Sequence, residues 1–247
     1  TPRWFQLYPS SDPELNRSLL RRAEESGYSA VVVTVDTPLL GWRERDIENA
    51  YLPFLDAEGL ANYFADPVFR GSLDDPPGEN EFAAVRRFID VFSDATLTHE
   101  TVSEIVDMTD LPVVVKGVLK PENARSAVEA GADGVVVSNH GGRQVDGAVG
   151  ALDSLPRVTE AVPEDATVLF DSGVRRGADA VKALALGADA VMLGRPYVYG
   201  LGLNGEDGVR EVVKNFRADF DLTLGLTGCA SVDGIDDALL RESPRYR

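Results

Sequence analysis

The fold is decided by the stretch Glu129-Ala130-Gly131-Ala132-Asp133-Gly134-Val135-Val136-Val137, whose outline recurs at residues 25–33 and 186–193. Each copy is typical of a helix that ends at a glycine, which readily takes the left-handed conformation, followed by a short apolar strand. The apolar run is continuous rather than alternating, so the strand is expected to be buried on both faces. This pattern indicates a parallel sheet covered by helices.

Similar apolar runs predict six strands along the chain. They lie at residues 4–8, 30–35, 112–116, 134–137, 167–170 and 190–193. Helical patterns fall between most of them, and Asp12-Pro13 and Lys120-Pro121-Glu122 are typical of helix starts. Alternation of this kind in 247 residues favours a single domain of the TIM (β/α)8 barrel class over residues 1–247.

A long connection at about residues 37–80 interrupts the alternation. It contains five prolines and shows little periodicity before a helix-like stretch at residues 81–92. Long connections that follow a strand usually carry function rather than structure alone. We interpret it as a loop insertion at the functional end of the barrel and not as a second domain.

The charge balance is strongly acidic. The chain has 24 Lys+Arg against 41 Asp+Glu, a formal charge of −17, which disfavours nucleic-acid binding. Only four of the basic residues are lysines, a composition that suggests adaptation to concentrated salt; an ordinary acidic cytoplasmic enzyme is the alternative. No apolar run approaches the ~20 residues of a membrane span, and no signal peptide is apparent. The single cysteine, Cys229, fits a cytoplasmic location.

Polar residues gather directly after the predicted strands. They are Thr34, Asp36 and Arg43, then Lys116, then the segment 138–144, then the segment 171–177, and finally Gly194-Arg195-Pro196. In a parallel barrel all of these positions face one mouth, which predicts an active site there.

The last two clusters are suited to binding phosphate. Glycines admit an anion to backbone N–H groups, arginines add forked donors, and both segments lead into predicted helix starts. Glycines that serve only tight turns, with arginines that pair on the surface, are the alternative. Lys116 ends a buried strand and therefore requires a negative charge, which either a cofactor or a partner carboxylate could supply.

The two histidines have different expectations. His140 precedes Gly141-Gly142 and lies three residues before Arg143, a pattern that suits proton abstraction from a substrate whose carboxylate the arginine holds; a core histidine is the alternative. His99 is expected to be a solvated residue at a helix start. Cys229 is expected to be structurally buried. With so few histidines and cysteines, no metal site is predicted.

These motifs together resemble one family. Ser138-Asn139-His140-Gly141-Gly142-Arg143-Gln144 is similar to the active-site signature of the FMN-dependent L-2-hydroxy-acid-oxidising family, which includes glycolate oxidase, flavin L-lactate dehydrogenases, lactate oxidase and lactate 2-monooxygenase. The other matching motifs are Trp4-Phe5-Gln6-Leu7-Tyr8, Thr34-Val35-Asp36-Thr37-Pro38, Gly41-Trp42-Arg43, Val115-Lys116-Gly117, Asp171-Ser172-Gly173-Val174-Arg175 and Gly194-Arg195-Pro196. Residues 51–64 and 170–173 look most like the lactate 2-monooxygenase branch.

The resemblance implies a role for each matching residue. His140 would be the general base, oriented by Asp36. Tyr8, Arg43 and Arg143 would bind the substrate. The FMN contacts implied are Gln6, Thr34, Lys116 and Ser138 at the ring, and Asp171, Gly173, Arg175, Gly194 and Arg195 at the ribityl chain and phosphate.

The reaction implied is oxidation of a lactate-like L-2-hydroxy acid to the 2-oxo acid, with molecular oxygen or another electron acceptor, and with decarboxylation if the chain follows lactate 2-monooxygenase. We expect a homo-oligomer. The family has eight βα units and about six are found here, with the N-terminal part missing. A catalytically silent truncated barrel, or a partner subunit that retains only the anion-binding face, is therefore a second hypothesis. Another phosphate-binding barrel, such as an isomerase, is a third.

Overall fold

The computed structural model describes residues 1–241 of the chain and contains all six predicted strands, with ends shifted by at most two residues. They are β1 (Trp4–Leu7), β2 (Ala30–Thr34), β3 (Val113–Val118), β4 (Gly134–Val137), β5 (Thr167–Phe170) and β6 (Ala190–Val191). Their order in the sheet is the order of the chain, β1-β2-β3-β4-β5-β6. Consecutive parallel strands joined by helices are the βα units of the predicted barrel class.

The α-helices are α1 (Pro13–Glu25), α2 (Glu44–Glu48), α3 (Ala61–Phe64), α4 (Pro67–Gly71), α5 (Glu81–Val91), α6 (His99–Val106), α7 (Pro121–Glu129), α8 (Ala151–Thr159), α9 (Gly177–Ala185) and α10 (Arg195–Thr227). Four 3-10 turns are η1 (Pro53–Asp56), η2 (His140–Gly142), η3 (Val232–Gly234) and η4 (Asp237–Leu239). The predicted helix start at Asp12-Pro13 is confirmed: Pro13 opens α1, and the Asp12 side chain accepts hydrogen bonds from the backbone N–H groups of Glu14 and Leu15.

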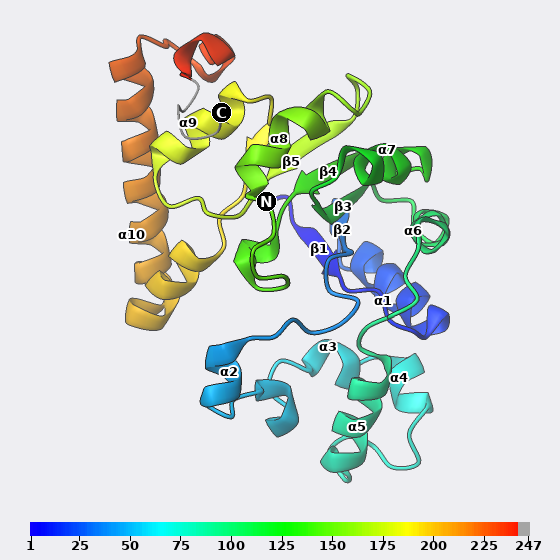
Figure 1. Ribbon diagram of the computed structural model, residues 1–247. Helices are drawn as coiled ribbons and strands as arrows, with labels where there is room; N and C mark the ends of the chain where they lie inside the picture. The colour runs from blue at the N-terminus through cyan, green and yellow to red at the C-terminus, as the bar shows by residue number, and fades with distance from the viewer. Residues whose placement is uncertain (242–247) are drawn as a thin grey trace. The chain divides into compact units, whose positions relative to one another are not determined.

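The chain divides into two compact units (Figure 1). The first comprises residues 1–117, 126–134 and 143–146. The second comprises residues 118–125, 135–142 and those from 147 onward.

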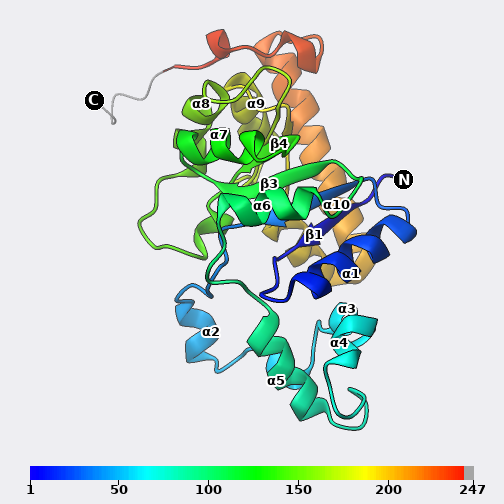
Figure 2. The same cartoon turned by 90° about the vertical axis from the view of Figure 1, so that its right-hand side faces the viewer.

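In the first unit, β1, β2 and β3 pair in parallel, with Phe5 opposite Val31 and Val33 opposite Val115. The strands and α1 contribute Leu7, Leu20, Val31 and Val33 to one core cluster. Helices α3, α4 and α5 lie beyond α1 (Figure 2) and add Phe69 and Phe88 to the same cluster.

The connection at residues 37–80 is more structured than expected, because it holds α2, η1, α3 and α4. Each of these segments spans only four or five residues, which is too short to leave a periodic pattern in the sequence. Asp66 anchors the segment. Its buried carboxylate caps α4 by accepting from the N–H groups of Val68 and Phe69, and it forms an ion pair with Arg22 at 2.9 Å. This pairing offsets the cost of burying the charge.

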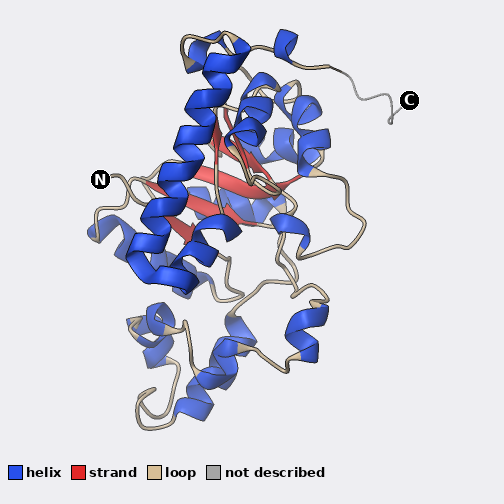
Figure 3. Cartoon of the chain, turned by 90° about the vertical axis from the view of Figure 1, so that its left-hand side faces the viewer, coloured by secondary structure: helices blue, strands red, loops and turns tan. Residues whose placement is uncertain are grey.

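The second unit contains β5 and β6 with the helices packed on them. Strand β5 contacts α8, β6 contacts α9, and α9 packs along α10. Figure 3 shows α10 as a long helix; it bends at Asn204 and Gly205, whose backbone angles are not helical. Among residues 1–241, no helix has both the length and the apolarity that crossing a bilayer requires.

Two minor expectations have different outcomes. His99 opens α6 behind the cap residue Thr98 and is exposed, as predicted. Cys229 is only partly buried, so the expectation of a structurally buried thiol is wrong. It follows the C-terminus of α10, where its Sγ lies 3.4 Å from the carbonyl oxygen of Gly234.

Candidate functional site

In the first unit, three predicted cofactor contacts lie side by side at the carboxyl ends of β1, β2 and β3. Thr34 is paired in register with Lys116, and the Gln6 amide donates to the Thr34 hydroxyl at 2.8 Å. Both Thr34 and Lys116 are buried, with 2% and 8% of their surface exposed. Amide, hydroxyl and ammonium groups therefore lie in one row and can donate hydrogen bonds to an electron-rich ligand.

Asp36 follows β2 and lies against the backbone of Gly117. A Cβ at Gly117 would lie 2.6 Å from the Asp36 Cβ and Cγ, and Gly117 has a φ of +105°. A side chain at position 117 would therefore both clash and strain the backbone. The glycine within β3 is thus required for the observed position of the Asp36 carboxylate.

Gln144 connects two segments that are about one hundred residues apart in the sequence. Its Oε1 accepts from the Gly41 N–H at 3.3 Å and from Arg43 Nη2 at 3.2 Å. Its Nε2 donates to the carbonyl oxygens of Asp36 at 2.7 Å and Leu39 at 2.9 Å. The backbones approach so closely that a Cβ at Gly41 would lie 2.7 Å from the Gln144 carbonyl oxygen. The sequence patterns predict no role for Gln144, and the structure identifies it as the residue that holds the segment 36–43.

Two guanidinium groups, those of Arg43 and Arg143, converge in this unit. Burial lowers the pKa of Arg43 from its ordinary value, and the charge of Arg143 lowers it further, while Asp46, Tyr8 and Asp36 oppose the shift. Asp46 forms a long ion pair with Arg143, with 3.9 Å between Oδ2 and Nη2. The buried Nε of Arg43 has no hydrogen-bond partner among the described residues. The pair is therefore suited to an incoming anion that can accept several hydrogen bonds.

The two arginines line a cavity of about 400 Å³. The remaining lining residues are Leu40, Gly41, Asp46, Ile47, Tyr51, Leu52, Pro53 and Phe54. Most of these side chains are apolar, and they come from the segment that contains α2 and η1. The predicted substrate-binding residues Arg43 and Arg143 thus share a cavity. Tyr8 lies near them, after β1, with its ring centroid 5.8 Å from that of Phe92.

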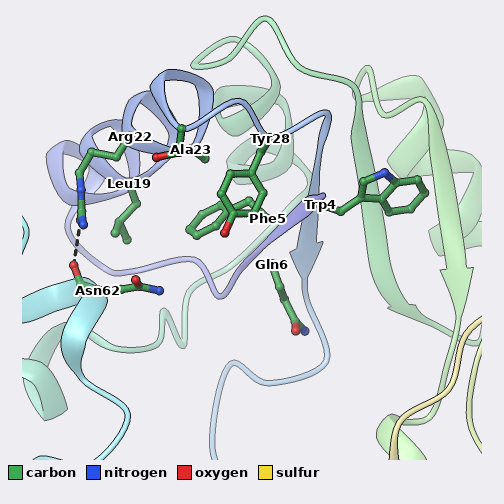
Figure 4. A pocket seen from close by; sticks show the side chains of 9 residues that line it. Trp4, Phe5, Gln6, Leu19, Arg22, Ala23, Tyr28 and Asn62 are labelled. Atoms are coloured by element: carbon green, nitrogen blue, oxygen red, sulfur yellow. Dashed lines mark hydrogen bonds between the residues drawn. The ribbon is translucent and has the colours of Figure 1, made fainter. Parts of the chain in front are cut away.

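A second cavity of about 340 Å³ in this unit runs along β1 and α1. Figure 4 shows Trp4, Phe5 and Tyr28 along it, and the Arg22 guanidinium donating to the carbonyl oxygen of Asn62 at 2.8 Å. Gln6 is the one candidate site residue that lines it. Its walls carry no His, Asp, Glu or Lys side chain and only one arginine, so it is a weaker candidate for chemistry than the cavity lined by two arginines.

In the second unit, His140 belongs to a tight backbone turn after β4. Its φ is +56°, and Gly141 and Gly142 that follow also have positive φ. The His140 N–H donates to the hydroxyl of Ser138, a side chain with no exposed surface. A positive φ is uncommon for residues other than glycine, although histidine takes it more readily than most, and such backbone positions are frequent at functional sites.

Ser172 supports this turn, although the sequence patterns predict no role for it. Its hydroxyl accepts from the N–H groups of Asn139 at 3.2 Å and Gly141 at 3.0 Å, and donates to Asp171 Oδ1 at 2.7 Å. Ser172 itself has a φ of +82°, which is unusual for a residue other than glycine. Asp171 thus acts on the histidine turn through Ser172.

The two expected helix starts differ in how they are capped. At α9, Asp179 Oδ2 accepts from the N–H groups of Arg175 and Arg176, and Asp219 accepts from Gly177. At α10 the cap residue is Gly194, and no side chain caps the helix. Side-chain carboxylates of this chain therefore occupy the N–H groups before α9, and α10 is the better anion site.

The arginines and glycines around these helix starts differ in their contacts. Arg195 donates to the Gly141 carbonyl oxygen at 2.5 Å and so joins α10 to the histidine turn. Arg175 donates to the neighbouring carbonyl oxygen of Val174 and remains exposed. Gly173 and Gly194 have open space where a side chain would lie. Within residues 1–241, no three His, Cys, Asp or Glu side chains are placed to hold a metal ion.

The predicted residues therefore fall into two groups. The first unit holds Gln6, Tyr8, Thr34, Asp36, Arg43, Lys116 and Arg143, and the second holds Ser138, His140, Asp171, Gly173, Arg175, Gly194 and Arg195. In each unit the residues lie at the carboxyl ends of parallel strands or in the turns that follow, which is where this class of fold places its chemistry.

Comparison with known proteins gives consistent matches. The family model for FMN-dependent dehydrogenase matches residues 1–242. L-Lactate oxidase of Lysinibacillus sphaericus is 45% identical, and the match covers 94% of this chain and 60% of that protein. 2-Hydroxyacid oxidase 1 of Mus musculus is 41% identical, and the match covers 98% of this chain and 64% of that protein. A solved structure of mandelate oxidase with (S)-2-phenylpropionate is 40% identical with a TM-score of 0.76, over 95% of this chain and 61% of that one. The chain thus spans about three fifths of the length of these relatives.

Proposed function

The chain belongs to the FMN-dependent dehydrogenase family, and on this premise we propose that it oxidises an L-2-hydroxy acid to the 2-oxo acid with FMN. The observation that carries the proposal is the pair Arg43 and Arg143 in one cavity of the first unit. Two guanidinium groups around a cavity form a forked donor set for a carboxylate. L-Lactate oxidase, 2-hydroxyacid oxidase and mandelate oxidase, by their names, act on acids of this class.

The chemistry of the residues present fits FMN. The buried Lys116, with Thr34 and Gln6 beside it, offers donors to a ring edge that becomes negatively charged on reduction. The uncapped start of α10 at Gly194, with Arg195 and the open position at Gly173, offers donors to a phosphate. Ser138, Asp171 and Arg175 complete the proposed cofactor contacts. When bound, FMN would supply the acceptor for the two electrons that leave the substrate.

We propose the following roles for the other residues in substrate binding and proton transfer. Arg43 and Arg143 hold the substrate carboxylate, and Tyr8 contacts its hydroxyl or carboxylate. His140 accepts a proton from the substrate, and Asp36 orients the imidazole and stabilises its charged form. The positive φ of His140 and the support from Ser172 favour this role, because unusual backbone positions that neighbouring residues stabilise cluster at active sites.

The oxidant, the assembly and the location are also proposed. Molecular oxygen or another acceptor would reoxidise the flavin. If the 2-oxo acid and hydrogen peroxide remained together, as in lactate 2-monooxygenase, they would react to a carboxylic acid one carbon shorter, carbon dioxide and water. A homo-oligomer in the cytoplasm is proposed, and the partly exposed thiol of the single cysteine is consistent with a reducing compartment.

An anaerobic absorption spectrum with a panel of 2-hydroxy acids tests the proposal. We expect a yellow protein whose flavin bleaches with an L-2-hydroxy acid, and a His140→Gln variant that keeps the flavin without bleaching. Product analysis in air then separates a 2-oxo acid from a decarboxylated acid. A yellow protein that bleaches with no 2-hydroxy acid would refute the proposal. A colourless, inactive protein would support the silent-barrel hypothesis.

A further inference from the structure

The cavity that contains the two arginines has a second feature, its apolar wall. Leu40, Ile47, Leu52 and Phe54 line it, together with Pro53 and Tyr51. Leu40, Ile47, Tyr51 and Leu52 are all exposed although they surround a hollow of about 400 Å³. Apolar side chains left exposed around a concave surface, with a few convergent polar groups, are typical of a small-molecule site.

The size of the cavity indicates which acids it suits. Cavities of ~300–1,000 Å³ are typical of ligand sites for molecules much larger than lactate. A carboxylate held by Arg43 and Arg143 would occupy only the polar end. A methyl group would leave the apolar lining, Leu40, Ile47 and residues 51–54, uncovered and in contact with water. A longer hydrocarbon chain or an aromatic ring would cover it.

The charges at the polar end restrict the ligand further. The lining contains two guanidinium groups and one carboxylate, that of Asp46, which gives a net charge of 2 − 1 = +1. A single carboxylate balances this charge. A second carboxylate at the far end of the ligand would face Leu52 and Phe54 and lose hydration without a partner.

We infer that this cavity binds monocarboxylic acids, with the carboxylate at the two arginines and the apolar group against residues 47–54. These residues select 2-hydroxy acids with an extended aliphatic or aromatic group over lactate. The inference rests on the proposed function for the hydroxy-acid chemistry, but the preference for apolar acids is a property of the cavity. Burial of one methylene contributes about 0.8 kcal/mol, so affinity should rise by about threefold to fourfold for each methylene that enters.

Equilibrium binding of unbranched carboxylates, from acetate to octanoate, to the purified 247-residue chain tests this by calorimetry. We expect affinity to rise with chain length and then level off as the cavity fills. Ile47→Asn should flatten the rise and leave acetate binding unchanged. Ile89→Asn is a matched control, because Ile89 lies on α5 outside the cavity and is 49% exposed against 51% for Ile47. The control should retain the wild-type slope.

The outcomes separate the inference from the proposed function. Equal affinities for acetate and octanoate, binding of neither acid, or a slope that Ile47→Asn leaves unchanged would overturn the inference. If L-lactate bleached the flavin but carboxylate affinity did not rise with chain length, the inference would be overturned and the proposed function would stand. A steep slope that Ile47→Asn removes would support the inference even if no 2-hydroxy acid bleached the flavin, a result that would refute the proposed function alone.

Discussion

Replacement of Gln144 by alanine tests whether the arginine pair is held in place by one amide. The side chain makes four hydrogen bonds, three to backbone groups of residues 36–41 and one to the Arg43 guanidinium. A neutral hydrogen bond contributes ~1 kcal/mol net and one to a charged group ~1.5–3 kcal/mol. Because the site is only partly buried, water would replace some of these bonds. We expect Gln144→Ala to lose about 2–3 kcal/mol in the free energy of unfolding.

The same change should alter ligand binding selectively. Arg43 would lose the acceptor that fixes one face of its guanidinium, and we expect carboxylate affinity to fall about tenfold, which corresponds to ~1.4 kcal/mol. KM should rise by a similar factor with little change in kcat, because Gln144 does not contact the reacting atoms. Gln144→Glu should also weaken binding, since its carboxylate would pair with Arg43 and face the carbonyl oxygens of Asp36 and Leu39.

Urea unfolding, acetate calorimetry and steady-state kinetics are the measurements. Asn215→Ala, at an exposed position of α10, is the control and should match wild type in all three. Gln144→Ala with wild-type acetate affinity and KM would refute the reasoning, even if its stability fell. A loss confined to kcat would also refute it, because the residue would then act on the chemical step.

Four other outcomes follow. Arg143→Lys should raise KM about tenfold with little effect on kcat, because an ammonium cannot offer forked donors; unchanged kinetics would remove Arg143 from carboxylate binding. Ser172→Ala should lower the free energy of unfolding by about 2 kcal/mol and Ser172→Gly by about 1 kcal/mol less, since glycine relieves the positive φ; equal losses in urea unfolding would contradict this. Burial raises the pKa of Tyr63 to about 12 from 10, so stability should be level below pH 10 and fall by about 1.4 kcal/mol per pH unit between 10 and 12, a loss absent in Tyr63→Phe. The melting temperature should rise from millimolar to molar KCl, and an unchanged value would reject adaptation to salt.

The sequence predicted the strands well because each buried parallel strand leaves a continuous apolar run, as at residues 134–137. The fold class, six βα units of a TIM barrel, is confirmed by the same runs in the order of the sheet. The helices between residues 44 and 71 were missed, because their stability depends on contacts such as the buried Asp66 and not on local periodicity.

The supporting residues of the site were also beyond sequence reasoning. Gln144 and Ser172 act through hydrogen bonds to backbone groups 31 to 108 residues away, and such bonds leave no local signal. Capping of α9 by Asp219 is of the same kind. One signal was available for Ser172: it lies between Asp171 and Gly173 directly after a strand, where a tight turn is expected.

The hold of Gln144 on residues 36–43 has a consequence for how this protein can change over evolution. Gln144 fixes the position of the Arg43 guanidinium, so the segment after Arg43 can lengthen, shorten or exchange residues without displacing that group. The buried Asp66 and Phe69 restrict insertions and deletions further along, whereas none of the residues of α2 and η1 is buried, so exchanges there leave the core unchanged. Diversification of the acids accepted can proceed there, while the anchoring arginine remains inherited intact.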